Sequence, residues 1–179
     1  MKRKIILEKE IFGGSKAVLY TIRFVGSSKT ETEKFFDQYN RQEDDLKSIA
    51  TNIDLMLNRY GIRENIYRFE GDNANRNNLR CLPPQENEYG RKNKSRLRLY
   101  FWRFNEGVGI IGGGCFKPLQ IKGKIIKKYQ EVPTCEKAAL ILEKVSSAII
   151  DKINEDVLEI TDIEIAYDNI DDLTLEIEI

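Results

Sequence analysis

The sequence predicts an α+β fold: a small antiparallel sheet with an N-terminal helical hairpin packed on it, plus a later helix and a C-terminal β-hairpin. Three observations favour this class. Apolar and polar residues alternate over 96–102 (RLRLYFW), which is the period of a strand. Apolar residues recur at helical spacing over 42–60 and 133–153. Glycine, asparagine and proline separate these segments, as turns require.

The N-terminal third is expected to contain two strands followed by two helices. Strands are predicted over 4–12 and 17–25, because Gly13-Gly14-Ser15 supplies a hairpin turn between two apolar runs. Thr30 is predicted to cap a helix of about ten residues, with acidic residues in its first turn. The second helix is predicted to end before Gly61, because glycine is the commonest residue just beyond a helix.

The middle of the chain is predicted to hold a short strand, a long loop and a second hairpin. The strand covers 66–69, and the loop covers 70–94. In the loop, Gly, Asn and Pro interrupt any helical or strand spacing of apolar residues. A tight turn then joins the strand at 96–102 to a return strand over 108–116. Gly112-Gly113-Gly114 lies inside the return strand, where it favours a bulge or a sharp bend.

The C-terminal part is predicted to hold one helix and an acidic hairpin. Segment 117–130 fits either a strand or a loop, and Pro133-Thr134 then opens the helix with Thr134 as its N-cap. The hairpin covers 156–179 and pairs either with the main sheet or with a second copy of the chain. We therefore divide the chain into a main domain over 1–155, interrupted by the loop at 70–94, and a C-terminal extension.

The charges are balanced in total but separated along the chain. The 179 residues include 29 Lys or Arg, 29 Asp or Glu and no His. Segment 60–130 is strongly basic and segment 151–179 is strongly acidic, which suggests a basic working surface and an acidic appendage. The absence of histidine excludes imidazole acid–base catalysis and histidine metal ligands. We expect neither a metal site nor a cofactor.

Cysteine usage and hydropathy favour a cytoplasmic protein. Cys81, Cys115 and Cys135 are odd in number and lack zinc-ligand spacing, so buried, reduced thiols are expected. Glu8 and Glu10 interrupt the N-terminal apolar stretch too early for a signal peptide. Because no apolar run approaches the roughly 18 residues of a membrane span, we expect no membrane partner.

The strand over 96–102 suggests a nucleic-acid surface. One face carries Leu97, Leu99 and Phe101, and the other carries Arg96, Arg98, Tyr100 and Trp102. A sheet packed on the first face would offer cations and flat rings to RNA on the second. The alternative is a half-buried strand whose arginines are solvated and whose rings cover a neighbouring helix. The predicted nucleic-acid-binding residues are Arg76, Arg80, Arg91, Lys92, Tyr100, Trp102, Lys122, Lys124, Lys127 and Lys128.

Three short motifs, in this order, resemble those of a known protein family. They are RLRLYF at 96–101, CFK at 115–117 and KKYQEVPTCEKAALIL at 127–142. Over residues 17–145 the chain resembles the HigB-like branch of the RelE/ParE superfamily of toxin–antitoxin toxins. The resemblance implies a helical hairpin packed on a small antiparallel sheet.

The resemblance also implies an activity. Such toxins are ribosome-dependent endoribonucleases that cut mRNA without a metal, through attack of the 2′-OH on the adjacent phosphate. Basic side chains would stabilise the extra negative charge. The residues that correspond by position are Arg96, Arg98, Arg103, Lys117 and, more loosely, Tyr129. The implied partners are RNA on the ribosome and a cognate antitoxin protein.

The chain departs from the family in its length, with additions at 70–94, at 118–126 and at both ends. Two alternatives therefore stay open. In the first, the chain is a non-catalytic protein on the same scaffold that binds nucleic acid or inhibits a host enzyme. In the second, it is a structural or phage-associated oligomer, such as a homodimer, joined through its C-terminal hairpin.

Overall fold

A computed structural model describes residues 1–9, 14–63, 67–69, 76–83 and 94–179. In this part of the chain a seven-stranded sheet has the order β11-β1-β2-β6-β5-β4-β3, and β7-β8 and β9-β10 form two small sheets. The main strands are β1 (Lys2–Lys9), β2 (Val18–Phe24), β3 (Arg68–Phe69), β4 (Leu79–Leu82), β5 (Leu97–Arg103), β6 (Val108–Phe116) and β11 (Thr174–Glu178). The short ones are β7 (Gln120–Ile121), β8 (Lys124–Ile125), β9 (Leu158–Ile160) and β10 (Ile165–Tyr167).

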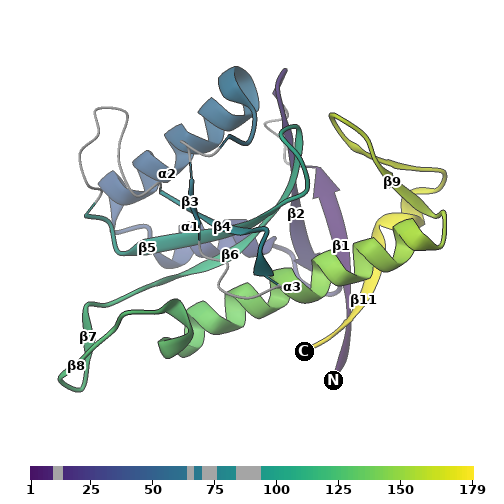
Figure 1. The fold of residues 1–179 in the computed structure, drawn as a ribbon. Helices are drawn as coiled ribbons and strands as arrows, with labels where there is room; N and C mark the ends of the chain where they lie inside the picture. The colour runs from purple at the N-terminus through teal and green to yellow at the C-terminus, as the bar shows by residue number, and fades with distance from the viewer. Residues whose placement is uncertain (10–13, 64–66, 70–75, 84–93) are drawn as a thin grey trace.

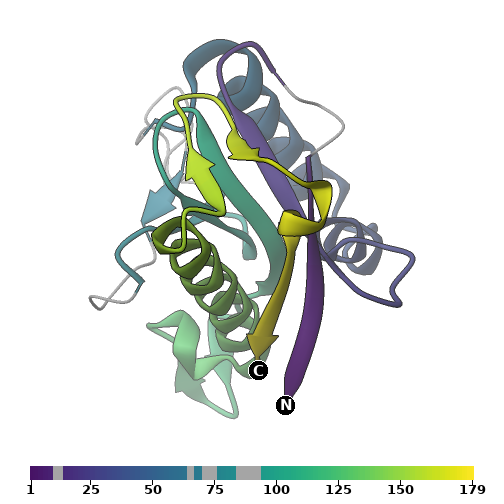
Figure 2. The same cartoon turned by 90° about the vertical axis from the view of Figure 1, so that its right-hand side faces the viewer.

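Helices cover both faces of the main sheet, so the molecule has three layers (Figures 1 and 2). One face carries α1 (Glu31–Gln38) and α2 (Glu43–Leu55), which continues into η1 (Met56–Tyr60). The other face carries the long helix α3 (Pro133–Asn154). The α+β class and the N-terminal helical hairpin are thus confirmed. No helix within the described ranges is long and apolar enough to cross a membrane.

The sheet is mixed rather than purely antiparallel, because β2 pairs with β6 in parallel. The predicted hairpins explain how this pair arises. β1 pairs with β2, and β5 pairs with β6, each antiparallel as predicted. The remaining edge of β6 then receives β2 running in the same direction, and this contact joins the two hairpins into one sheet.

The strand β5 contributes to two separate apolar cores, one on each face of the sheet. Leu97, Leu99 and Phe101 lie in the core beneath α1 and α2. Tyr100 and Trp102 lie in the core beneath α3. The predicted alternation is therefore confirmed. Because α3 packs over the second face, the prediction of an RNA surface there is wrong, and the alternative, in which the rings cover a helix, is confirmed. The solvated arginines of that alternative are wrong for Arg98, which is buried.

Local signals at the first helix are confirmed in detail. The Glu33 backbone N–H donates to Thr30 Oγ1 at 3.1 Å, and the Thr30 N–H donates to Glu33 Oε2 at 2.7 Å. This reciprocal pair is a capping box, which satisfies two N–H groups that the helix itself leaves open. Gly61 follows the second helix with a φ of +72°, a left-handed conformation that glycine adopts without strain.

The loop predicted over 70–94 contains a strand, so that prediction is wrong in its centre. Residues 70–75 and 84–93 lie outside the described residues, but β4 lies between them and pairs with β5. All four residues of β4 are buried. The four-residue run LRCL is too short to show a period, and its strand conformation comes from pairing with a distant segment.

The glycine run in β6 forms a bulge, one of the two predicted alternatives. Leu99 pairs with Gly114 while Phe101 pairs with Ile111, so β6 holds one residue more than β5 at this point. The extra residue inverts the alternation of side chains along β6. Ile111 faces α1 and α2, whereas Cys115, four positions later, faces α3.

The C-terminal half differs from the prediction in two places. Val132 is the N-cap of α3, and Pro133 takes the first helical position, where its missing N–H costs nothing, so the assignment of Thr134 is wrong. The acidic segment forms the β9–β10 hairpin within 158–167 instead of one hairpin over 156–179. Its last strand, β11, pairs with β1 at the edge of the main sheet, which confirms one of the two predicted pairings. The short helices η4 (Tyr129–Glu131) and η5 (Ile170–Leu173) complete the fold.

Candidate nucleic-acid interface

The structure separates the predicted site residues by their burial. Arg91 and Lys92 lie outside the described residues. Arg96, Arg103 and Lys117 are half-buried. The buried members are Arg76, Arg80, Arg98, Tyr100, Trp102 and Tyr129. The exposed members are Lys122, Lys124, Lys127 and Lys128.

Arg76 is held by carboxylates of α3. Its guanidinium donates to both carboxylate oxygens of Glu136, at 2.9 and 2.8 Å, and to Glu143 at 2.5 Å. It also donates to the hydroxyl of Tyr129 at 3.0 Å. The hydrogen bonds to Glu136, then those to Glu143 and Tyr129, raise the pKa of Arg76 further above its already high value, against the effect of burial. This cation fixes α3 to the sheet and does not face solvent.

Arg80 and Arg98 are buried against backbone oxygens. The Arg98 side chain is 3% exposed and donates to the carbonyls of Ser95 and Leu97, at 3.0 and 2.6 Å. Arg80 donates to the carbonyls of Asn77 and Leu79 in the same manner. Guanidinium groups used in this way donate hydrogen bonds to backbone carbonyls at the ends of strands, where the pairing of the sheet stops.

The residues matched to the toxin family do not gather at one point. The Lys117 backbone N–H donates to the Arg96 carbonyl at 2.8 Å, so these two residues are neighbours. Arg103 lies at the other end of β5, about 20 Å away along the strand, and its Nε donates to the Ile62 carbonyl. Tyr129 packs beneath α3 beside Tyr100. Arg103 and Lys117, which the resemblance implies would act on one phosphate, are therefore far apart.

Four of the predicted cations are exposed and lie, with the half-buried Lys117, in one segment, residues 117–128, which we term the lysine lobe. It contains Lys117, Lys122, Lys124, Lys127 and Lys128 and no acidic residue. Its centre is the β7–β8 hairpin, which projects from the main sheet in Figure 1. Both residues of its turn, Lys122 and Gly123, have positive φ, as a tight two-residue hairpin requires. Within the described ranges, Lys122, Lys127 and Lys128 form no ion pair.

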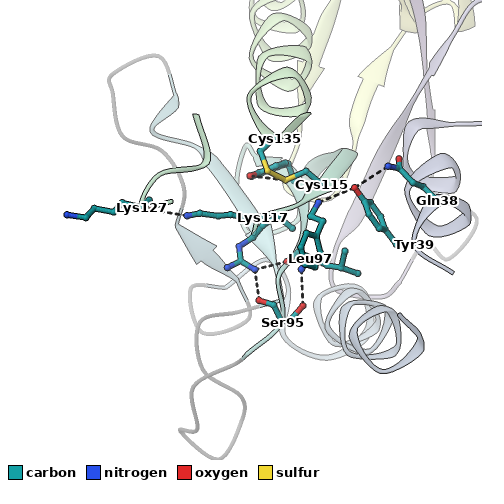
Figure 3. Close-up of a disulfide and its surroundings, with 11 residues drawn as sticks. Gln38, Tyr39, Ser95, Leu97, Cys115, Lys117, Lys127 and Cys135 are labelled. Carbon is teal, nitrogen blue, oxygen red and sulfur yellow. Dashed lines mark hydrogen bonds between the residues drawn. A yellow bond between two sulfur atoms is a disulfide. The ribbon is translucent and has the colours of Figure 1, made fainter. Parts of the chain in front are cut away.

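A disulfide closes the base of the lysine lobe. Cys115 at the end of β6 and Cys135 in the first turn of α3 are joined, with Cα atoms 5.1 Å apart (Figure 3). The prediction of three reduced thiols is wrong for this pair, and Cys81 remains a buried thiol. The cause is the glycine bulge, which turns Cys115 toward α3. Neither cysteine spacing nor strand alternation could reveal that rotation.

Glu131 fixes the end of the lobe where it meets α3. Its carboxylate accepts from the backbone N–H groups of Lys127 and Lys128, at 3.0 and 2.8 Å, and pairs with the Lys124 ammonium at 2.9 Å. The Lys128 N–H, then the Lys124 ammonium and the Lys127 N–H, lower the pKa of Glu131 to about 2. Lys117 Nζ donates to the Lys127 carbonyl at 2.9 Å, which holds the two ends of the lobe together.

Comparison of the chain with protein families, with curated proteins and with solved structures found no match.

Proposed function

We propose that the chain is a non-catalytic RNA-binding protein, and that the lysine lobe holds the RNA phosphates. The observation that carries this proposal is the concentration of five lysines, without an acidic residue, in one projecting segment. Phosphates attract such a cluster because each contact releases a counterion from the nucleic acid. The fixed base of the lobe supports the proposal further, since a held loop loses less conformational freedom on binding.

The positions of the arginines support binding without cleavage. A transition-state phosphate needs donors that reach it directly and converge on it. Arg98 and Tyr129 are buried, and Arg103 lies at the far end of β5. The endoribonuclease activity implied by the resemblance stays a prediction, which shortening of the labelled RNA would reveal.

The test measures the affinity for a fluorescently labelled single-stranded RNA as a function of salt. The double variant Lys122→Gln/Lys127→Gln is compared with Lys47→Gln/Lys144→Gln, which removes the same charge from exposed positions on α2 and α3. We expect the lobe variant to bind about tenfold more weakly, because each exposed ion pair contributes about threefold. The slope of log K against log salt should fall by about 1.4, at about 0.7 per phosphate contact on a single strand.

Several results would contradict the proposal. Equal losses of RNA affinity in the lobe variant and the control variant would show that only the total charge of the protein matters. Binding that does not depend on salt would exclude phosphate contacts. Stronger association with vesicles of anionic lipid than with RNA would identify a membrane surface as the partner, through the exposed Leu119 and Ile125 of the lobe. Shortening of the RNA, with or without ribosomes, would restore the endoribonuclease prediction.

A further inference from the structure

A second basic feature lies between α1 and α3, at the ends of the only parallel strand pair among the described residues. β2 and β6 pair from Val18 to Thr21, and then separate. Beyond that point β2 pairs only with β1, and β6 enters its bulge. The chain continues from β2 to α1 on one face and from β6 to α3 on the other. Crevices at the carboxyl ends of diverging parallel strands are where open sheets commonly bind ligands.

Two adjoining hollows, of about 700 and 200 Å³, form this cleft. They share four lining residues, so they lie side by side: Glu31, Lys34, Lys137 and Ile141. Sequence patterns do not reveal this cleft, because its walls come from α1 and α3, which lie far apart in the sequence.

Four cations line the cleft: Arg3, Lys4, Lys34 and Lys137. The ring of Phe24 lies beside two of them, with Arg3 at 5.3 Å and Lys34 at 5.9 Å from its centre. One acidic side chain, Glu31, faces them and pairs with Lys34 at 2.7 Å. Lys4 and Lys137 are exposed, and neither forms an ion pair in the described part of the chain. The cleft therefore has a surplus of positive charge.

The backbone of the bulge contributes to the lining of the smaller hollow. Gly113 and Gly114 of β6 line it, together with Gln38, Tyr39 and Thr134. A Cβ atom at Gly113 would stand 3.8 Å from Glu31, in van der Waals contact with it, and one at Gly114 would clash with the Phe35 ring. The two glycines thus let α1 approach the backbone of the bulge closely, and this backbone forms part of the wall of the hollow.

The cleft and the lysine lobe adjoin each other at the disulfide. Gly114 and Thr134, at one end of the cleft, are the chain neighbours of Cys115 and Cys135. Figure 3 shows Lys117 and Lys127 on one side of the disulfide, and Gln38 and Tyr39 on the other. The Tyr39 hydroxyl also accepts from the Phe116 backbone N–H at 3.1 Å, where the chain leaves the sheet for the lobe.

We propose that the cleft binds phosphates of single-stranded RNA, as a continuation of the strand held on the lysine lobe. This inference rests on the proposed function and adds a second contact region to it. A cationic groove with an aromatic ring in its wall suits a single strand, whose backbone follows the charge while its bases meet flat side chains. Free oligophosphates share the recognised chemistry, so the experiment distinguishes them from RNA.

The first test uses the double variant Lys4→Gln/Lys137→Gln in the same salt-dependent RNA measurement. We expect binding to weaken about tenfold and the salt slope to fall by about 1.4, because this variant removes two cations that hold phosphates of a single strand. Combining this variant with Lys122→Gln/Lys127→Gln should multiply the two reductions in affinity, because the sites are separate. An unchanged affinity in the cleft variant, beside a tenfold loss in the lobe variant, would overturn the inference and leave the proposed function standing.

The second test does not depend on RNA affinity. Inorganic pyrophosphate is added to isotope-labelled protein, and the amide resonances of Gly113 and Gly114 are followed. We expect these resonances to shift in the wild type and not in Lys4→Gln/Lys137→Gln, while Lys47→Gln/Lys144→Gln responds like the wild type. Shifts with pyrophosphate and no RNA binding by the wild type would replace RNA by a free oligophosphate as the ligand. Absence of any shift, together with unchanged RNA affinity in the cleft variant, would leave no phosphate site there.

Discussion

The arginines near β4 and β5 and the lysines of the lobe come from one basic stretch of sequence, but the fold uses them in opposite ways. Arg76, Arg80 and Arg98 are less than one-tenth exposed and donate to carboxylates or to backbone carbonyls. Lys122, Lys127 and Lys128 are exposed. A guanidinium offers five donors in a plane, which suits a buried site with several acceptors. A lysine ammonium is strongly hydrated and stays in water. A basic sequence block therefore does not by itself define a basic surface.

The largest effect on the free energy of unfolding is expected from removing one of the buried arginines. Arg76→Ala should lower the free energy of unfolding by about 3 kcal/mol, because it leaves the carboxylates of Glu136 and Glu143 without their cation. Denaturation by urea measures the change. Lys122→Ala serves as the exposed control and should change stability by less than about 0.5 kcal/mol. Similar small reductions in both variants would mean that Arg76 contributes no more than a solvated cation.

The disulfide is the boundary between the two regions, and its removal should have an effect of comparable size. Cys115→Ser/Cys135→Ser should lower the free energy of unfolding by about 3 kcal/mol, the value for a loop of this length, since the bridge spans 20 residues. Thiol titration of the unreduced, denatured wild type should find the single thiol of Cys81. Two results would instead support the reduced cysteines expected from the sequence. One is a count of three reactive thiols, and the other is a free energy of unfolding that a dithiol reductant does not change.

The smallest effect concerns the acidic residue that anchors the lobe. The pKa of Glu131 lies near 2 in the folded protein, below its ordinary value of 4.5. The hydrogen bonds and ion pair that it forms with Lys127, Lys128 and Lys124 therefore stabilise the fold fully above about pH 4.5, and this stabilisation disappears as the pH falls toward 2. Carboxyl and amide resonances should report one transition in that window. Glu131→Gln should remove the transition from the amides of Lys127 and Lys128, and its persistence there would assign the titration to another group.

Local features of the fold could be predicted because they depend on neighbouring residues. The capping box at Thr30, the Gly61 helix end and the alternation of β5 each follow from a few consecutive side chains and the backbone period. For the candidate site, the exposed lysines of 117–128 could be named in advance. Packing of Tyr100 and Trp102 against a helix was one of two alternatives, and the residues of the strand could not decide between them. The burial of Arg98 was not predicted, because nothing in the strand itself shows that a distant helix covers its second face.

Patterns of consecutive residues were enough to establish the α+β class, the order of most elements, the capping of the first helix and the presence of a basic segment. They could not establish which cations face solvent, because that depends on where α3 packs. The pairing of Cys115 with Cys135 and the cleft between α1 and α3 likewise emerge only in the folded chain. These features require segments far apart along the chain to meet, and in β6 a single extra residue at the bulge sets which face the later side chains occupy.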